Sequence, residues 1–99
     1  MKDLKLNAYN IKRAISPHDF YSFELSGAKL KKHEWNDGGI CPFHDDKNPG
    51  SFRVNLNTGA YKCFACRSAG GDVIAFTMAI RSVHFIEALK QLASDWGLV

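Results

Sequence analysis

The sequence lacks the features of a membrane or secreted protein. No apolar run approaches the roughly 18 to 20 residues of a membrane-spanning helix, and the N-terminal MKDLKLNAYN lacks the apolar stretch of a secretory signal. Its three cysteines are an odd number, which suits a disulfide framework poorly. We therefore expect a cytoplasmic protein without a membrane partner, whose reduced thiols are available to bind metal.

The chain also lacks a strong charge, repeats, low-complexity tracts and an internal linker. Its formal net charge of +3 and pI near 8.8 permit contact with a polyanion without requiring it. A hydrophobic fraction of 45% is ordinary for a globular protein, but a chain of 99 residues buries only a modest core. We expect a single domain over residues 1–99 that gains stability from an additional cross-link such as a metal ion.

Helices are predicted toward both ends of the chain. Pro17 is acceptable as a first helical residue, so Ser16 predicts a capped short helix over residues 17–25. A second helix is expected over residues 72–80, with Asp72 or Ser68 as its cap. The last helix is the clearest, because Gly97 closes an amphipathic apolar stripe made of Phe85, Ile86, Leu89, Leu92, Ala93 and Trp96.

Strands are predicted between these helices. Residues 27–35 resemble a basic strand, and the turn signal at 36–39 would fold it back onto a strand that begins at Ile40 and Cys41. Residues 51–64 alternate around a break at 57–59 and predict a second hairpin, followed by a small-residue loop at 68–71. The fold class is therefore α+β, an antiparallel sheet flanked by helices, with a helical segment at 1–25, sheet at 27–66 and helices at 72–97.

Two pairs of potential metal ligands, CPFH and CFAC, each have two residues between their members, and 18 residues separate the pairs. A two-residue gap lets two side chains of one tight turn reach the same ion at about 2.0 to 2.3 Å. Three thiolates and an imidazole favour zinc over magnesium, calcium or manganese. Because four protein ligands leave no position for a reactive water, we predict one structural zinc ion bound by Cys41, His44, Cys63 and Cys66.

Simpler interpretations exist for several of these residues. The cysteines could be unligated core residues, although the paired arrangement uses every cysteine in the chain. Lys62 and Arg67 could serve only to neutralise the net negative charge of a zinc ion with three thiolates. His18, His33 and His84 have no cysteine at ligand spacing, so we expect surface or packing roles for them.

The stretch from Cys41 to Ile80, CPFHDDKNPGSFRVNLNTGAYKCFACRSAGGDVIAFTMAI, resembles the zinc-binding domain of bacterial and phage DnaG-type DNA primases. The resemblance extends to KLKK at 29–32 and to FIEALKQLA at 85–93. It implies a zinc-ribbon-like sheet with packed helices that helps to recognise the template trinucleotide at which priming starts. It also implies a separate magnesium-binding catalytic domain, in cis or in trans, and a replicative helicase as a further partner. We assign no catalytic residue to this chain, and Asp45 and Asp46 are expected to form a solvated turn.

The chain departs from the family pattern at two places. Gly50 is inserted between Pro49 and Ser51, which predicts a bulge in or before the following strand. Glu34 and Asp37 stand where the family tends to have basic residues, so DNA affinity or sequence preference is expected to differ.

Single-stranded DNA is held by basic side chains along the phosphates and by aromatic rings under the bases. The predicted DNA contacts are Lys31, Lys47, Arg53, Tyr61, Lys62 and Arg67. Further candidate aromatics are Trp35 and Phe52, whereas Phe43 and Phe64 are expected to pack in the core beside the metal.

Two functions follow from these observations. The first is a zinc-dependent module of a DNA primase that binds single-stranded template. The alternative is a freestanding phage or mobile-element zinc-finger protein that binds a replication or transcription partner without primase activity. An autonomous enzyme is disfavoured, because the sequence offers no convincing nucleophile and base pair and no open metal position.

Overall fold

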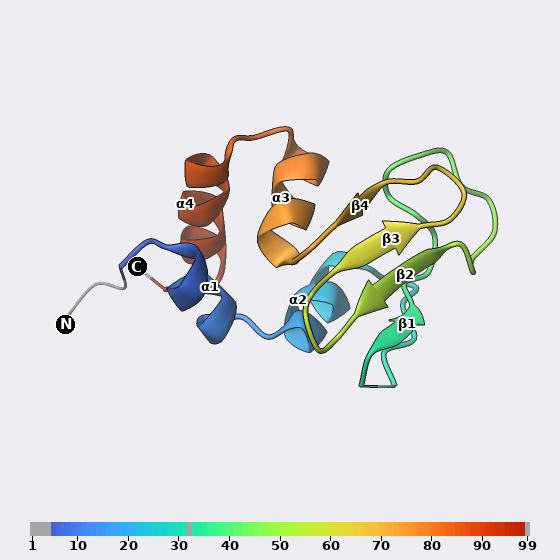
Figure 1. Ribbon diagram of the computed structural model, residues 1–99, viewed down its shortest axis with the longest axis horizontal. Coiled ribbons are helices and arrows are strands. Elements are labelled where there is room, and N and C mark those ends of the chain that lie inside the picture. The colour runs from blue at the N-terminus through green and yellow to red at the C-terminus, as the bar shows by residue number, and fades with distance from the viewer. Residues whose placement is uncertain (1–4, 32, 99) are drawn as a thin grey trace.

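The computed structural model describes residues 5–31 and 33–98, so Lys32 of the KLKK segment and residues 1–4 of the predicted N-terminal segment lie outside it. Helices α1, α3 and α4 gather at one end of the molecule and the sheet lies at the other (Figure 1). None of the helices in the described ranges is long and apolar enough to cross a membrane. In chain order the elements are α1 (Ala8–Ala14), α2 (Pro17–Glu24), β1 (Trp35–Asp37), β2 (Phe52–Asn55), β3 (Tyr61–Cys63), β4 (Ala69–Gly70), α3 (Val73–Arg81) and α4 (Phe85–Asp95).

The α+β class and the antiparallel sheet are confirmed. The strands follow the order β1-β2-β3-β4, and every neighbouring pair is antiparallel. The predicted hairpin over residues 51–64 is present as β2 and β3, with Arg53 opposite Lys62. The Asn55 side chain stabilises its turn by accepting hydrogen bonds from the backbone N–H groups of Asn57 and Thr58.

The helix caps follow the sequence signals. Ser16 Oγ accepts a hydrogen bond from Asp19 N–H at the start of α2, and Asp72 does the same for Ala75 N–H at the start of α3. Helix α1 lies within the segment expected to be helical at 1–25, although the irregular apolar pattern did not place it as a separate helix. It is capped by Asn7 and buries Ile11.

The prediction of a strand over 27–35 with a turn at 36–39 is wrong. Among the described residues of this segment before Trp35, Lys29 alone makes a bridge, to Asp37, and the chain reverses before Trp35 rather than after it. The Asn36 side chain accepts a hydrogen bond from the Lys31 N–H. This occupies a backbone donor that a longer strand pairing would use. Ile40 and Cys41 belong to a loop and begin no strand.

The glycine pair in this segment serves close packing. Gly38 lies against the Phe52 ring, where an added Cβ would come within 2.5 Å of a ring carbon. Gly39 has φ +81 and approaches the backbone of Gly27. The NDGG sequence therefore forms a closely packed segment beside the sheet and not a hairpin turn.

Three smaller expectations also need correction. The 68–71 loop contains the short strand β4, which pairs with β3 through Tyr61 and Gly70. Phe85 and Ile86 are 42% and 57% exposed, so the apolar stripe of α4 is buried only from Ala88 onward. Gly50 lies in the turn before β2, with φ +118, and the regular pairing of β2 with β3 contains no bulge.

Aromatic side chains join the two ends of the molecule. Phe76 on α3 is the centre of this cluster, with ring centroids 5.6 Å from Phe20, 5.3 Å from Tyr61 and 5.4 Å from Phe43. Phe43 stacks on Tyr61 at 5.2 Å. Each such pair adds about 0.5–1.5 kcal/mol beyond the burial of its area. Because Phe43 belongs to the CPFH segment, the cluster fixes the first ligand turn against the helices.

Candidate metal centre and open sheet face

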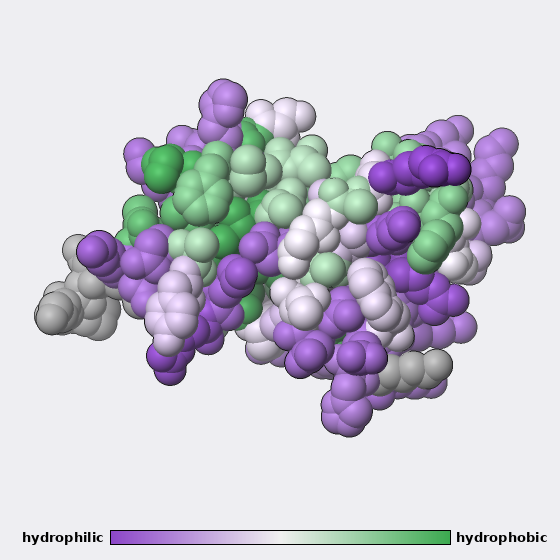
Figure 2. Space-filling view, viewed as in Figure 1, coloured by the Kyte–Doolittle hydropathy of each residue, from purple (hydrophilic) through white to green (hydrophobic). Residues whose placement is uncertain are grey.

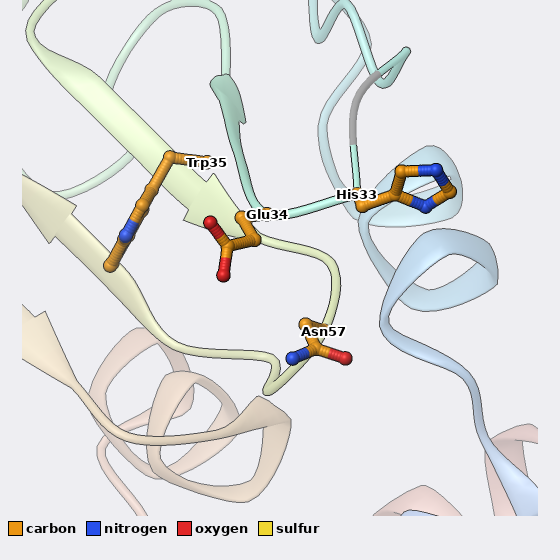
Figure 3. A pocket seen from close by; sticks show the side chains of 4 residues that line it. All are labelled: His33, Glu34, Trp35 and Asn57. Atoms are coloured by element: carbon orange, nitrogen blue, oxygen red, sulfur yellow. The ribbon is translucent and has the colours of Figure 1, made fainter.

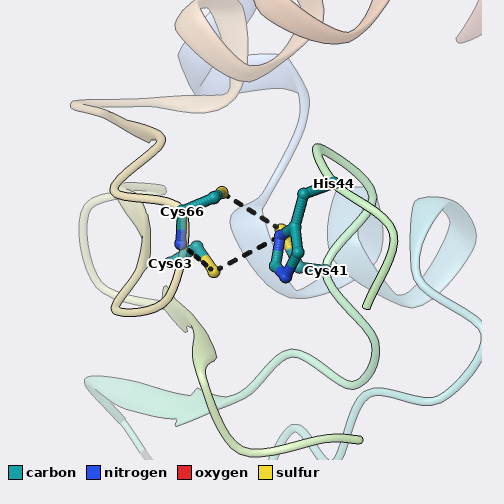
Figure 4. A group of neighbouring side chains, drawn as sticks. All are labelled: Cys41, His44, Cys63 and Cys66. Carbon is teal, nitrogen blue, oxygen red and sulfur yellow. Dashed lines mark hydrogen bonds between the residues drawn. The ribbon is translucent and has the colours of Figure 1, made fainter. Parts of the chain in front are cut away.

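The two ligand pairs come from different parts of the fold and converge. Cys41 and His44 lie in the loop between β1 and β2, while Cys63 ends β3 and Cys66 follows it in a tight turn. Figure 4 shows the four side chains directed toward one point. Their sulfur and ring-nitrogen atoms all lie within 4.8 Å of one another.

The geometry fits a tetrahedral zinc ion. Cys41 Sγ lies 3.9 Å from Cys66 Sγ, and Cys63 Sγ lies 3.9 Å from His44 Nδ1. A tetrahedral centre with bonds of about 2.3 Å would separate its ligand atoms by about 3.8 Å. The four residues could therefore hold zinc with little adjustment, Nδ1 being the histidine atom directed inward.

Backbone groups orient these ligands. The N–H of Phe43 donates to Cys41 Sγ at 3.4 Å, and the N–H of Cys66 donates to Cys63 Sγ at 3.5 Å. Arg67, with φ +67, donates its N–H to the Cys63 carbonyl and completes the second turn. Donors directed at sulfur favour its anionic form, which is the form that binds metal.

Asp46 supports the first ligand turn. Its Oδ2 accepts from the Cys41 N–H at 3.0 Å, and its Oδ1 lies 3.6 Å from His44 Nε2. The hydrogen bond from Cys41 lowers the pKa of this carboxyl. The 3.6 Å contact is longer than a hydrogen bond, but a carboxylate on that side favours a proton on Nε2, the tautomer that leaves Nδ1 free for a metal. Sequence reasoning treated Asp46 as a solvated turn residue and missed this contribution.

The thiols need a cation to ionise together. Burial raises the pKa of Cys41 to about 12, while Ser68 Oγ, 3.3 Å from Cys66 Sγ, lowers the pKa of that thiol to about 6. Closely spaced thiolates repel one another strongly where water is excluded. A divalent cation at the centre removes that penalty, which is why such a site couples folding to metal binding.

The sheet has one covered face and one open face. Phe52, Val54 and Tyr61 turn inward, whereas Arg53 and Lys62 point outward from neighbouring positions of β2 and β3. On the view in Figure 2, hydrophobic residues gather over the helical end and hydrophilic residues are more frequent toward the sheet end.

Two grooves cross the open face. One of about 240 Å³ is lined by Trp35, Arg53, Lys62 and Phe64. Another of about 170 Å³ is lined by Lys29, Lys31, Trp35, Asn36, Asp37 and Arg53. Trp35 and Phe64 are 44% and 66% exposed, and Lys62 Nζ lies 4.9 Å from the centroid of the Phe64 ring. We define these residues, without the buried Asn36, as the open face; Asp37 lies opposite Arg53 in the β1–β2 pairing and places one acid among the cations.

The structure divides the predicted DNA contacts into three groups. Lys31, Arg53 and Lys62 lie on the open face. Lys47 and Arg67 are exposed within the ligand loops. Tyr61 is only 3% exposed and packs against Phe43 and Phe76, so its ring is not available to a base and its assignment as a DNA contact is corrected.

The expected core role of Phe64 is wrong as well. Tyr61 and Cys63 face inward, so the alternation of a strand directs Lys62 and Phe64 outward. That signal was present in the sequence, because a ligand at Cys63 fixes which face its neighbours occupy. Phe43 is partly buried and packs against the core, as predicted.

Comparison with known proteins agrees with this architecture. Residues 12–99 match the model of the CHC2 zinc finger family. A DNA primase from Mycobacterium leprae is 51% identical over 79 residues, which is 80% of this chain and 11% of that primase. A DNA primase from Clostridium acetobutylicum is 40% identical over 83 residues, covering 84% of this chain and 14% of that primase.

A solved structure is similar over nearly the whole chain. The Aquifex aeolicus primase, determined with its zinc-binding and RNA polymerase domains, superposes with a TM-score of 0.73 and 30% identity. The match covers 95% of this chain and 22% of that one. The present chain thus spans only a small part of the length of these relatives. It belongs to the CHC2 zinc finger family, the zinc-binding domain of DnaG-type DNA primases.

Proposed function

We propose that this domain is the template-binding module of a DNA primase and that it binds single-stranded DNA on the open face of its sheet. The observation that carries the proposal is the alternation of exposed rings and cations on that face. Trp35 and Phe64 border a groove whose other lining residues are Arg53 and Lys62. Stacked bases contribute about 1–3 kcal/mol each and cations neutralise the phosphates, so this combination suits a single strand.

In this proposal the metal centre is structural and contains one zinc ion. All four nearby ligand atoms belong to the protein, and the two ligand turns border β2 and β3, which carry Arg53 and Lys62. Bound zinc would fix both turns and keep the short strands in register. The site would then contribute to DNA binding through rigidity and not through contact with the strand.

The polymerising chemistry is assigned to a separate catalytic domain, in cis or in trans. The similar Aquifex aeolicus chain includes an RNA polymerase domain beside its zinc-binding domain. We extend that arrangement to this protein, acting in the cytoplasm during primer synthesis. The proposal treats residues 1–99 as one domain, and a replicative helicase is a further partner of the assembly.

Binding to short single strands tests the proposal. We expect fluorescence anisotropy to show affinity that falls as salt rises, because phosphate neutralisation releases counterions. Lys62→Ala should weaken binding and lower the slope of log K against log salt by about one. Lys90→Ala is the matched control, because Lys90 is an exposed lysine on α4, away from the sheet. Affinity that does not change between low and moderate salt would exclude a nucleic-acid ligand.

A freestanding interaction protein is the second candidate, and an aromatic pair where α2 meets the end of α4 favours it. Phe23 is 77% exposed, and its ring centroid lies 6.0 Å from that of Trp96 beside a cavity of about 160 Å³. Such a surface suits an apolar side chain of a protein partner. If the zinc-loaded protein binds no strand, this second function becomes the better explanation.

A further inference from the structure

An open cavity of about 700 Å³ adjoins the open face at the edge of the sheet. It is lined by His33, Glu34, Trp35 and Asn57. Figure 3 shows Glu34 between the Trp35 ring and Asn57, while His33 extends away from these three. We propose that this cavity reads one base of the bound strand, that it selects a base bearing an amino group, and that guanine fits best. The inference rests on the proposed function and names a ligand class for an extension of the same surface.

Trp35 provides the stacking surface of the pocket. Its side chain is 44% exposed, and it lines this cavity as well as both grooves of the open face. A strand whose phosphates contact Arg53 can therefore place a base on the indole ring without leaving the surface. Stacking alone accepts any base, so discrimination must come from the polar groups beside the ring.

Glu34 is the group that discriminates. Its carboxylate is exposed and forms no ion pair within residues 5–31 and 33–98, although Lys29, Lys31 and Arg53 line the neighbouring groove together with Asp37. An ionised carboxylate only accepts hydrogen bonds, so it repels phosphate oxygens and binds N–H groups on base edges. A negative charge at the border of a DNA-binding face weakens general affinity, and it is useful there only if it contacts a donor.

The backbone of Glu34 is held in a fixed place, which limits where its carboxylate can reach. The Glu34 carbonyl accepts hydrogen bonds from Leu56 N–H and from Asn36 Nδ2, each at 2.9 Å. Asn57 is fixed in the β2–β3 turn, where its N–H donates to Asn55 Oδ1 at 2.8 Å. Glu34 and Asn57 therefore both stand on preorganised backbone, which favours selective recognition.

The donor pattern of the bases then sets the order of preference. Guanine presents N1–H and the N2 amino group side by side, and both can donate to one carboxylate while O6 accepts from the Asn57 amide. Cytosine and adenine offer one amino group each. Thymine has a single N3–H between two carbonyl oxygens, which a carboxylate repels. We infer the order guanine, then cytosine or adenine, then thymine.

Anisotropy with labelled nine-nucleotide thymine strands that differ only at the central base tests this order. We expect zinc-loaded protein to bind the strand with a central guanine about tenfold more tightly than the all-thymine strand. Inosine, which lacks the N2 amino group, should lose most of that preference. Glu34→Gln should bring the guanine and thymine strands close to equal affinity and raise binding to the thymine strand, because a repelling charge is gone. Glu87→Gln, which removes an exposed carboxylate from α4, should leave the tenfold preference intact.

The outcomes separate this inference from the proposed function. If the wild-type protein binds every strand equally and with strong salt dependence, the open face binds DNA and the pocket reads no base. Preference for guanine that persists in Glu34→Gln would also overturn the role of Glu34. If the wild-type protein binds no strand at any salt concentration, both the pocket and the proposed function fail together.

Discussion

The helical end of the molecule and its sheet end are stabilised by different means. Helices α1, α3 and α4 bury Ile11, Ile74, Leu89 and Leu92 almost completely against one another. The strands at the other end are two to four residues long, and their register depends on side-chain hydrogen bonds, tight glycines and the four converging ligands. Hydrophobic burial suffices for the first region, whereas the second needs a cross-link to hold a functional surface in shape.

Removing the metal or a ligand should separate the two regions most completely. In Cys63→Ser, or after chelation of zinc, we expect the sheet to unfold, because in comparable sites metal binding contributes on the order of 10 kcal/mol to folding. The helices should keep much of their signal, since their core residues lie outside the ligand loops. Hydrogen exchange resolves the two regions, with circular dichroism as the overall measure. An unchanged spectrum after complete metal removal would contradict this dependence.

Among the apolar side chains, Phe76 should contribute most to the stability of both regions. Its ring contacts Phe20 and Tyr21 on one side and Phe43 and Tyr61 on the other. Phe76→Ala should lower the free energy of unfolding by about 3–5 kcal/mol. The control is Phe85→Ala, at a ring that is 42% exposed, where we expect a change smaller than about 1 kcal/mol. Urea denaturation with and without zinc measures both variants, and equal losses would show that Phe76 is no special link.

The hydrogen bond of Tyr21 links the two regions, and its contribution to stability should depend on pH. Its hydroxyl donates to the Gly59 carbonyl at 2.7 Å, which ties α2 to the β2–β3 turn, and burial raises the pKa of this phenol above its usual value near 10. The phenol must ionise at a higher pH in the folded state. Its contribution to stability is therefore complete below about pH 10 and decreases as the pH rises further.

Tyr21→Phe tests this contact. We expect a loss of about 1–3 kcal/mol near neutral pH, because a buried carbonyl is left without its donor. Above about pH 10 the difference between variant and wild type should shrink. Tyr9→Phe is the control, since Tyr9 is 65% exposed. If the difference in the free energy of unfolding between wild type and Tyr21→Phe stayed constant through the alkaline range, the phenol would not have the raised pKa expected from burial.

The same contrast explains how much could be predicted from sequence. Ligand spacing, the Asn-Thr-Gly turn and the caps at Ser16 and Asp72 are local signals, and the structure contains each of them. The position of β1 could not be read locally, because the side chain of Asn36 binds the backbone of Lys31 and decides where the chain reverses. Helix α1 is short, and it owes its stability to tertiary packing of Ile11 against α3 and α4, which periodicity over seven residues hardly reveals.

Within the candidate site, the metal ligands, most of the cations and Trp35 were predictable, whereas Phe52, a further candidate aromatic, is fully buried and cannot stack on a base. Spacing alone identified Cys41, His44, Cys63 and Cys66 as a group, and the structure brings them together. Tyr61 and Phe64 were assigned to opposite faces from those they occupy. The choice depends on which side of the three-residue strand β3 meets the helices. The inward ligand Cys63 indicates that side, and the contact of Tyr61 with Phe76 agrees with it.

The smallest expected effect concerns the junction where β4 passes into α3. Asp72 caps α3 by accepting from Ala75 N–H at 2.8 Å, and it also pairs with Lys12 of α1 at 3.3 Å. Asp72→Ala removes both contacts and should cost about 1 kcal/mol, nearly all of it from the cap. Asp72→Asn keeps a capping oxygen and loses only a partly exposed ion pair, so its cost should be a few tenths of a kcal/mol. Thermal unfolding of the two variants separates the contributions. If they lose equal stability, the junction is held by charge, and the helical end depends on electrostatics more than its apolar core suggests.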